Sequence, residues 1–287
     1  MRLSLIDATS YIYRAFHALP PLSNARGFPT HAIYGFTTMF FRVLRERAPE
    51  YAAAVFDAGG KTERHREYAG YKAQRPPMPD ALAMQVPYVY QIVEALHVPL
   101  LMAEGYEADD IIGTVATRAA ADGCHVTIVS GDKDFFQLVG PAIAVFDPLR
   151  DKTYRAEDVE ARFGVPPRAL ADLMALTGDA VDNIPGVPGI GEKTASALLQ
   201  EFGTVERLFA SLDRVGRPKL REALKAHAEQ VRVNRGLVTI RTDLPLAFPT
   251  VLAPRPSPDW ERLRVLFQEL EFTRLLAHLR RSGEETR

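Results

Sequence analysis

Short apolar runs alternate with helix-like stretches through the first half of the chain, and this alternation limits the possible folds more than any other feature. The runs that we expect to form strands lie at residues 3–6, 52–56, 98–102, 126–129 and 143–146. The helix-like stretches between them lie at 32–47, 81–96 and 109–121. Strands that alternate with helices predict an α/β fold, with a mostly parallel sheet covered by helices on both faces.

The second half of the chain reads differently. Beyond about residue 157 helical segments are broken by Gly and Pro, with a weak strand signal at 237–240. We therefore expect two domains, a core at 1–157 and a mainly helical region at 158–287.

The end of the chain carries three further signals. A Pro-rich segment at 253–258 precedes an amphipathic stretch that predicts one helix at 260–279. The polar tail at 280–287 is expected to fray.

Composition excludes several classes of protein. Of the 287 residues, 47% are hydrophobic and 25% are charged, which excludes a disordered or collagen-like chain. The single cysteine, Cys124, cannot form an internal disulfide and indicates a reducing compartment. Neither a leader-like start nor a run long enough to span a membrane is present, so we expect a cytoplasmic protein without a membrane partner.

Acidic residues stand where the apolar strands end. Asp7 and Asp57 follow the first two predicted strands, and Asp132 and Asp134 follow the fourth through a Ser-Gly turn. In an open parallel sheet the carboxyl ends of the strands border one crevice, where ligands bind. Each acid alone is explained as a turn former or helix cap. Together they predict that four carboxylates converge.

Two further acidic clusters extend this set to nine. The clusters are GYEADDIIG, with Glu107, Asp109 and Asp110, and TGDAVDNIPG, with Asp179 and Asp182. Converging carboxylates repel one another unless cations neutralise them. Oxygen ligands without nearby cysteine favour Mg²⁺ or Mn²⁺, and two ions about 4 Å apart suit a phosphodiester displacement.

A glycine-rich segment, GVPGIGEKTA at 186–195, predicts a helix-hairpin-helix. It fails as a nucleotide-binding phosphate loop because Glu192 separates the last glycine from the lysine. In a hairpin, Gly189 and Gly191 permit a tight turn whose N–H groups face a DNA phosphate, supported by Lys193 and Thr194. An ordinary turn between packed helices explains the glycines but not the lysine and threonine.

The segment 59–79 is basic and carries tyrosines. It contains Arg64, Lys72 and Arg75 together with Tyr71. The total charge of the chain gives no argument for DNA binding, since 35 Lys and Arg face 36 Asp and Glu. Without the nine clustered acids the balance is 35 against 27, so an acidic pocket inside a basic frame is expected.

These motifs together resemble the 5′ nuclease domain at the amino end of bacterial DNA polymerase I, within the flap endonuclease superfamily. The resemblance runs from LSLIDATSYIYRAFHALPPL through GYEADDIIGT, SGDKDFFQLV and TGDAVDNIPGVPGIGEKTA to FQELEFTRLL. It implies a PIN-like α/β/α core, a helical arch at about 59–96 and a helix-3-turn-helix module with its hairpin at 183–203.

The resemblance also implies roles for individual residues. It places Asp7, Asp57 and Asp109 around a first metal ion, and Asp109, Asp132, Asp134 and Asp182 around a second. Glu107, Asp110 and Asp179 match acids that act directly or through water. Arg64 and Lys72 match catalytic arch residues that stabilise the scissile phosphate. Contacts with DNA are implied for Tyr13, which stacks on a terminal base, and for Arg14, Tyr71 and Arg75. A K⁺ ion is implied at the hairpin.

The implied activity is a divalent-metal-dependent 5′ to 3′ exonuclease and 5′ flap endonuclease. Its partners would be DNA with a 5′ flap, a nick or a 5′ single-stranded end, and a DNA polymerase in cis or in trans; a monomer is expected. Two alternatives remain. One is a non-catalytic module that binds branched DNA. The other is a haloacid-dehalogenase-type phosphatase, although Thr9 stands where that chemistry needs a second acid.

Overall fold

The computed structural model describes residues 1–246 and 256–284, with side chains up to residue 279 in the last helix. Its centre is one six-stranded sheet in the order β3-β2-β1-β4-β5-β6. The first five are parallel to their neighbours and β6 is antiparallel to β5. The strands are β1 (Arg2–Asp7), β2 (Tyr51–Val55), β3 (Leu100–Leu101), β4 (His125–Val129), β5 (Ile143–Asp147) and β6 (Lys152–Tyr154).

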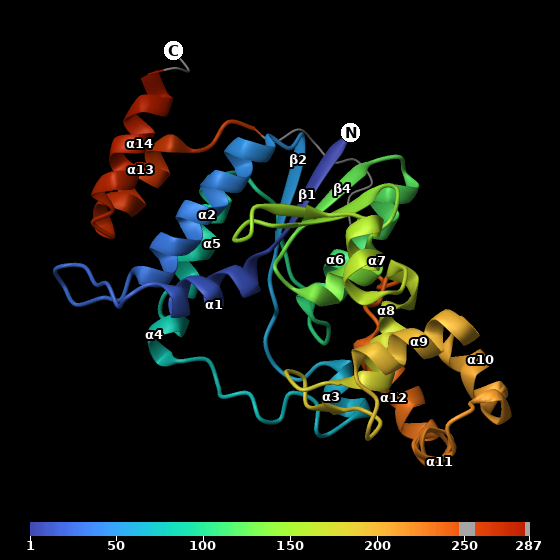
Figure 1. Ribbon diagram of the computed structural model, residues 1–287. Helices are drawn as coiled ribbons and strands as arrows, with labels where there is room; N and C mark the ends of the chain where they lie inside the picture. Colours follow the sequence, from blue (N-terminus) through green and yellow to red (C-terminus); the bar gives the residue numbers. More distant parts are fainter. Residues whose placement is uncertain (247–255, 285–287) are drawn as a thin grey trace.

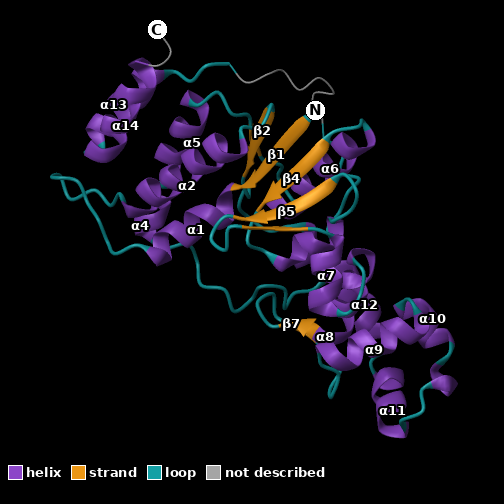
Figure 2. Ribbon diagram, turned by 45° about the horizontal axis from the view of Figure 1, so that its top comes forward, coloured by secondary structure: helices purple, strands orange, loops and turns teal. Residues whose placement is uncertain are grey.

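Helices cover both faces of the sheet, which confirms the predicted three-layer core (Figures 1 and 2). Alternate strand residues point to opposite layers, because Leu3 and Leu5 pack in one cluster and Ile6 in the other. One layer contains α1 (Ala8–Ala18), α2 (His31–Arg47), α4 (Asp80–Ala83) and α5 (Val86–Ala95). The other contains α6 (Ala108–Ala121), the 3₁₀ helix η1 (Lys133–Leu138), α7 (Ala156–Phe163) and α8 (Leu170–Thr177).

The helical region extends from α8 away from the sheet (Figure 2). Its elements are η2 (Pro167–Ala169), β7 (Gly178–Asp179), β8 (Ile184–Pro185), α9 (Glu192–Phe202), α10 (Val205–Ala210), η3 (Leu212–Arg214), α11 (Pro218–Ala226) and α12 (Ala228–Val238). Buried residues of α9 and α10 belong to the same cluster as those of α6, so the region is packed onto one side of the core.

Two predicted elements have a different secondary structure from the one expected. The strand signal at 237–240 is the end of α12 and the turn after it. The stretch 81–96 divides into α4 and α5, because Pro87 in the first turn of α5 has no N–H to donate to the carbonyl of Ala83. Between them the buried Gln85 accepts, at its Oε1, the N–H groups of Ala32 and Ile33 at the start of α2.

The predicted last helix is also two helices. These are α13 (Trp260–Glu269) and α14 (Thr273–Glu284), and the chain turns between them at Glu271, whose φ is 59°. Part of the polar tail expected to fray is therefore helical. Residues 253–255 of the Pro-rich segment lie outside the described residues. Within the described ranges, every helix is too short or too polar to span a bilayer.

The predicted arch segment begins with the short helix α3 (Glu63–Glu67). A stretch without regular structure then leads from α3 to α4 and passes below α1 in Figure 1. This route carries Tyr71, Lys72 and Arg75 past the carboxyl ends of the strands. The arch segment therefore forms one wall of the site described next.

Candidate active site

A cleft of about 720 Å³ opens at the carboxyl edge of the parallel strands. Its lining includes eight of the nine predicted acids, which are Asp7, Asp57, Glu107, Asp109, Asp132, Asp134, Asp179 and Asp182. Lys72, Arg75 and Lys133 lie among them, and Tyr13 lines the wall. The predicted convergence of carboxylates is therefore present, although the acids come from segments up to 175 residues apart in the chain.

Local structure explains why these acids point into the cleft. Asp7 ends β1 and caps α1, since its side chain accepts the N–H of Ser10. Asp132 follows β4 and caps η1 in the same way by accepting the N–H of Asp134. Asp109 stands in the first turn of α6, where the helix dipole favours a negative charge. Asp7 and Asp132 thus cap helices and also line the cleft.

A first group of cleft acids has raised pKa values. Burial raises the pKa of Asp7 to about 7, although Ser130 donates a hydrogen bond to it at 2.7 Å, and the charges of Asp57 and Asp132 add to the rise. Burial and the neighbouring charges of Asp7 and Asp132 hold the pKa of Asp109 well above its usual range. Burial also raises the pKa of Asp57. These three carboxylates therefore repel one another across the cleft.

A second group surrounds Lys133. Burial and the charge of Asp132 raise the pKa of Asp134 to about 7, and its Oδ1 has no hydrogen-bond partner within the described residues. Burial acts to raise the pKa of Asp179 as well. The Lys133 ammonium, 2.5 Å from Asp179 Oδ2, and the N–H of Val181 outweigh that effect, so the pKa is lowered. Lys133 was not predicted as a site residue, although its place between two acids was a usable signal.

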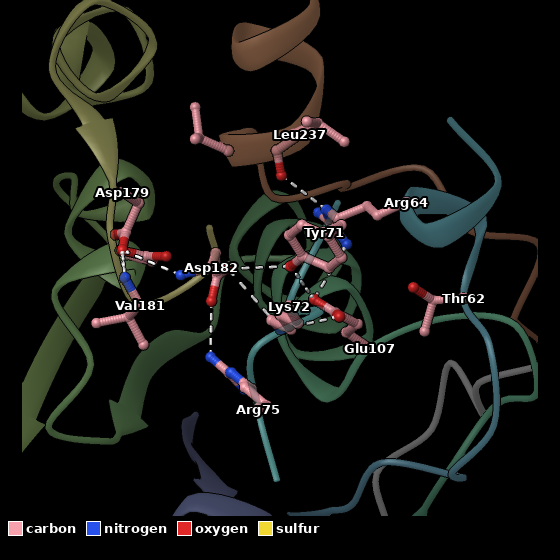
Figure 3. Close-up of polar contacts among 12 residues, drawn as sticks. Thr62, Arg64, Tyr71, Lys72, Arg75, Glu107, Asp179, Val181, Asp182 and Leu237 are labelled. Carbon is pink, nitrogen blue, oxygen red and sulfur yellow. Dashed lines mark hydrogen bonds and ion pairs between the residues drawn. The ribbon is translucent and has the colours of Figure 1, made fainter. Parts of the chain in front are cut away.

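Asp110, the ninth acid, lies outside the cleft. Its carboxylate accepts two hydrogen bonds from the Arg64 guanidinium, at 2.5 and 2.7 Å, and Arg64 also donates to the carbonyl of Leu237 (Figure 3). Both side chains are buried and line a separate small hollow. Neither side chain lines the cleft, because the two pair with each other inside the protein, although Arg64 Nη1 also lies 3.5 Å from Oε2 of the cleft acid Glu107.

The arch segment supplies partners for two of the cleft acids. Lys72 Nζ lies 2.9 Å from Glu107 Oε1, and Arg75 Nη2 lies 2.6 Å from Asp182 Oδ1. The Tyr71 hydroxyl lies within 3.0 Å of both Glu107 and Asp182, as Figure 3 shows, and donates its proton to one of them. Tyr71 is buried, so in this arrangement it supports the cleft wall rather than facing a ligand.

The remaining predicted residues lie in three places. Tyr13 is half-buried and faces the cleft, while Arg14 lines a neighbouring pocket 3.9 Å from Asp147. The hairpin lies beyond the cleft at the start of α9. There Gly189 has a φ of 81°, Gly191 caps the helix, and Lys193 is exposed, with Thr194 beside it.

The donor set suits a divalent cation in its chemistry. Carboxylate oxygens are the preferred ligands of Mg²⁺ and Mn²⁺, and the raised pKa values of Asp7 and Asp109 indicate that the cleft lacks positive charge. Asp134 Oδ1 accepts no hydrogen bond within the described residues, and its nearest cation is Lys133 Nζ at 3.6 Å. In the described part of the chain, no three Asp, Glu, His or Cys side chains are grouped closely enough to hold an ion as they stand. Side-chain rotation toward an ion is therefore required.

Comparison with known proteins identifies the family to which this fold belongs. Residues 2–164 match the family described as 5′-3′ exonuclease, N-terminal resolvase-like domain, and residues 165–261 match 5′-3′ exonuclease, C-terminal SAM fold. The chain belongs to the 5′-3′ exonuclease family. It is a nuclease.

The relatives include both short and long proteins. A 5′-3′ exonuclease of Aquifex aeolicus is 41% identical over 274 residues, which cover 96% of this chain and 93% of that protein. DNA polymerase I of Pseudomonas aeruginosa is 43% identical, and there the match covers 99% of this chain but 32% of the polymerase. The chain thus spans about a third of the polymerases that it matches.

Solved structures share the fold. The T5 D15 protein co-crystallised with metal ions has a TM-score of 0.73 at 21% identity, covering 97% of this chain and 99% of that one. A T5 5′-exonuclease with bound divalent metal ions (zinc) has a TM-score of 0.70 at 25% identity, covering 84% and 90%. The predicted α/β/α core with its C-terminal helical region is confirmed.

Proposed function

We propose that the cleft hydrolyses DNA phosphodiesters beside a 5′ flap, a nick or a 5′ single-stranded end, with two divalent ions, Mg²⁺ or Mn²⁺. The observation that carries this proposal is the set of eight carboxylates in the cleft at the carboxyl edge of the sheet, three of them with strongly raised pKa values. Divalent ions bound to the T5 5′-exonuclease support it. Bound ions would neutralise the scissile phosphate and activate the attacking water.

The residues of the chain have separate tasks in this proposal. Asp7, Asp57 and Asp109 would hold one ion, and Asp132, Asp134 and Asp182 the other. Lys72 and Arg75 lie in the same cleft and would exchange their carboxylate partners for phosphate oxygens as the negative charge develops. Water attacks phosphorus and the bond to the 3′ oxygen breaks, which leaves a 5′-phosphate and a 3′-hydroxyl.

Tyr13 and the hairpin would position the DNA substrate. Tyr13 lines the wall and would stack on a base of the single strand, a contact worth roughly 1 to 3 kcal/mol. The exposed hairpin from Gly189 to Thr194 would grip a phosphate of the duplex and hold a K⁺ ion. The polymerase I relatives support a partnership with a DNA polymerase, in cis or in trans, in primer removal and repair. Such work fits a cytoplasmic monomer.

The test is incubation of a 5′-labelled flap duplex with the protein in Mg²⁺, in Mn²⁺ and in EDTA. We expect short labelled products with either ion and intact substrate in EDTA. Intact substrate under all three conditions, with tight binding, would instead support the non-catalytic DNA-binding module. A phosphatase is disfavoured because Thr9 accepts the N–H of Asp57 and supports the cleft wall; turnover of a small phosphomonoester would revive it.

A further inference from the structure

A second pocket, of about 290 Å³, lies beside the cleft. Ser10, Asp132 and Lys133 line both, so the two spaces adjoin. Its other walls come from α1, from the turn after β5 and from the last turn of α7, which contribute Arg14, Arg150 and Arg162. Four basic side chains and two acidic ones, Asp132 and Asp147, face this space. Its charge is therefore opposite to that of the cleft.

Arg14 is held with unused hydrogen-bond donors. Its Nη1 is buried and has no hydrogen-bond partner within the described residues, and the nearest carboxylate oxygen, on Asp147, is 3.9 Å away. The guanidinium packs flat against Gly131, where an added Cβ would lie 2.5 Å from Nη2. A buried donor without a partner costs about 1–3 kcal/mol, so this position favours an external acceptor.

Asp147 does not satisfy the arginines around it. Its side chain is buried and already accepts the N–H of Leu149, while Arg150 Nε stays 3.7 Å from its other oxygen. Arg162 is exposed and contacts the ring of Phe163. Guanidinium groups present five N–H donors in a planar fork that matches the oxygens of phosphate. Arg150 Nη1 donates to the Tyr154 hydroxyl at 3.3 Å, and the other guanidinium N–H groups of Arg150 and Arg162 donate no hydrogen bond within the described residues.

We propose that this pocket is a phosphate-binding subsite for nucleic acid next to the cleft. Its ligand is a phosphate group next to the scissile bond. This group is either a backbone phosphodiester or the 5′-terminal phosphate. The proposal rests on the proposed function only for the identity of the ligand as DNA. The proposal adds Arg150 and Arg162 to the site residues. They are the basic neighbours of Arg14, for which a DNA contact was already expected.

The test measures binding without cleavage. Affinity of a fluorescent 5′-flap duplex is measured in EDTA over a series of salt concentrations for Arg150→Gln/Arg162→Gln. The matched control is Arg2→Gln/Arg45→Gln, which removes two comparably exposed arginines at the opposite edge of the sheet. We expect the pocket variant to bind several-fold more weakly, with a salt slope smaller by about one or more, because each lost phosphate contact removes nearly one unit.

Two substrate changes distinguish the source of the phosphate. If the ligand is the 5′-terminal phosphate, a 5′-hydroxyl substrate weakens binding by the unaltered protein but not by the pocket variant. If the ligand is a backbone phosphodiester, a neutral methylphosphonate beside the scissile bond weakens binding by the unaltered protein but not by the pocket variant. A pocket variant whose affinity and slope equal those of the control would overturn the proposal, even if the protein cleaves flaps. A loss of binding in a protein that never cleaves would support it.

Discussion

Asp109 and Asp110 are neighbours in the first turn of α6, yet they lie in opposite electrostatic surroundings. Asp110 is neutralised by a buried arginine from α3, whereas Asp109 faces other carboxylates in the cleft. The same contrast occurs among the acids of the cleft itself. Asp7 and Asp134 have raised pKa values, and Asp179 has a lowered one beside its lysine.

The difference separates structural from functional acids. A buried ion pair that is satisfied within the chain links segments that are far apart, here α3, α6 and the carbonyl at the end of α12. Carboxylates left without a cation destabilise the protein and are retained where an external cation completes them. Each prediction below tests one side of this contrast.

The largest effect is expected for Asp109→Asn. The change keeps the shape but removes a charge that only the cleft uses, so flap cleavage falls by at least about 10³-fold. Flap binding in EDTA and the free energy of unfolding do not fall, because the lost charge was repelled. Cleavage kinetics and urea unfolding of the same preparation measure both. A variant that cleaves at the original rate would remove Asp109 from the site.

Asp110→Asn gives the opposite pattern. Arg64 then keeps only the more distant carboxylate of Glu107, at 3.5 Å, so the free energy of unfolding falls by about 3 kcal/mol. Urea unfolding at pH 7.5 measures the loss, and Asp109→Asn is the matched control. Equal stability of the two variants would mean that the ion pair between Arg64 and Asp110 has no structural role.

Stability without metal should decrease as pH rises from about 4 to 7. Asp7 and Asp134 have pKa values of about 7 when folded and 3.8 when unfolded, so the folded state binds more protons in this window. Each group then contributes a slope of up to about 1.4 kcal/mol per pH unit. Urea unfolding in EDTA should show this slope, and Asp7→Asn/Asp134→Asn should reduce it. A rising stability across that window would contradict the assignment.

The smallest effect is expected for Lys133→Met. Removing the ammonium beside Asp179 and Asp134 takes one positive charge from the cleft, so a divalent ion binds more tightly, by about tenfold. Titration with Mn²⁺ measures the change, and Lys193→Met, far from the acids, serves as the control. Weaker Mn²⁺ binding would show that Lys133 positions the ligands instead of competing with the ion.

The sequence predicted the sheet, its carboxyl edge and eight of the acids that meet there, because strand ends and helix starts are local signals. It could not separate Asp109 from Asp110, since the partner of Asp110 comes from α3 and is itself held by a carbonyl 173 residues farther along. The division between α4 and α5, in contrast, had a local signal in Pro87, which removes a hydrogen bond from the helix.

The basic pocket also could not be read from the sequence. Arg14, Arg150 and Arg162 belong to three elements that only the sheet brings together, and charged residues on a helix or turn ordinarily face solvent. Lys133 could have been predicted more readily. A lysine between two aspartates at a strand end is a local pattern, and its pairing with Asp179 depends on where the helical region folds back.

Proton release on Mn²⁺ binding tests the central claim most directly, that the cleft acids share protons until a divalent cation replaces them. Calorimetric titration at pH 6.5 in two buffers with different ionisation enthalpies counts the protons released. We predict about one proton or more per protein at pH 6.5, close to none at pH 9, and the same count at pH 6.5 for Asp110→Asn. Mn²⁺ binding without proton release at pH 6.5, or no binding at all, would contradict the account.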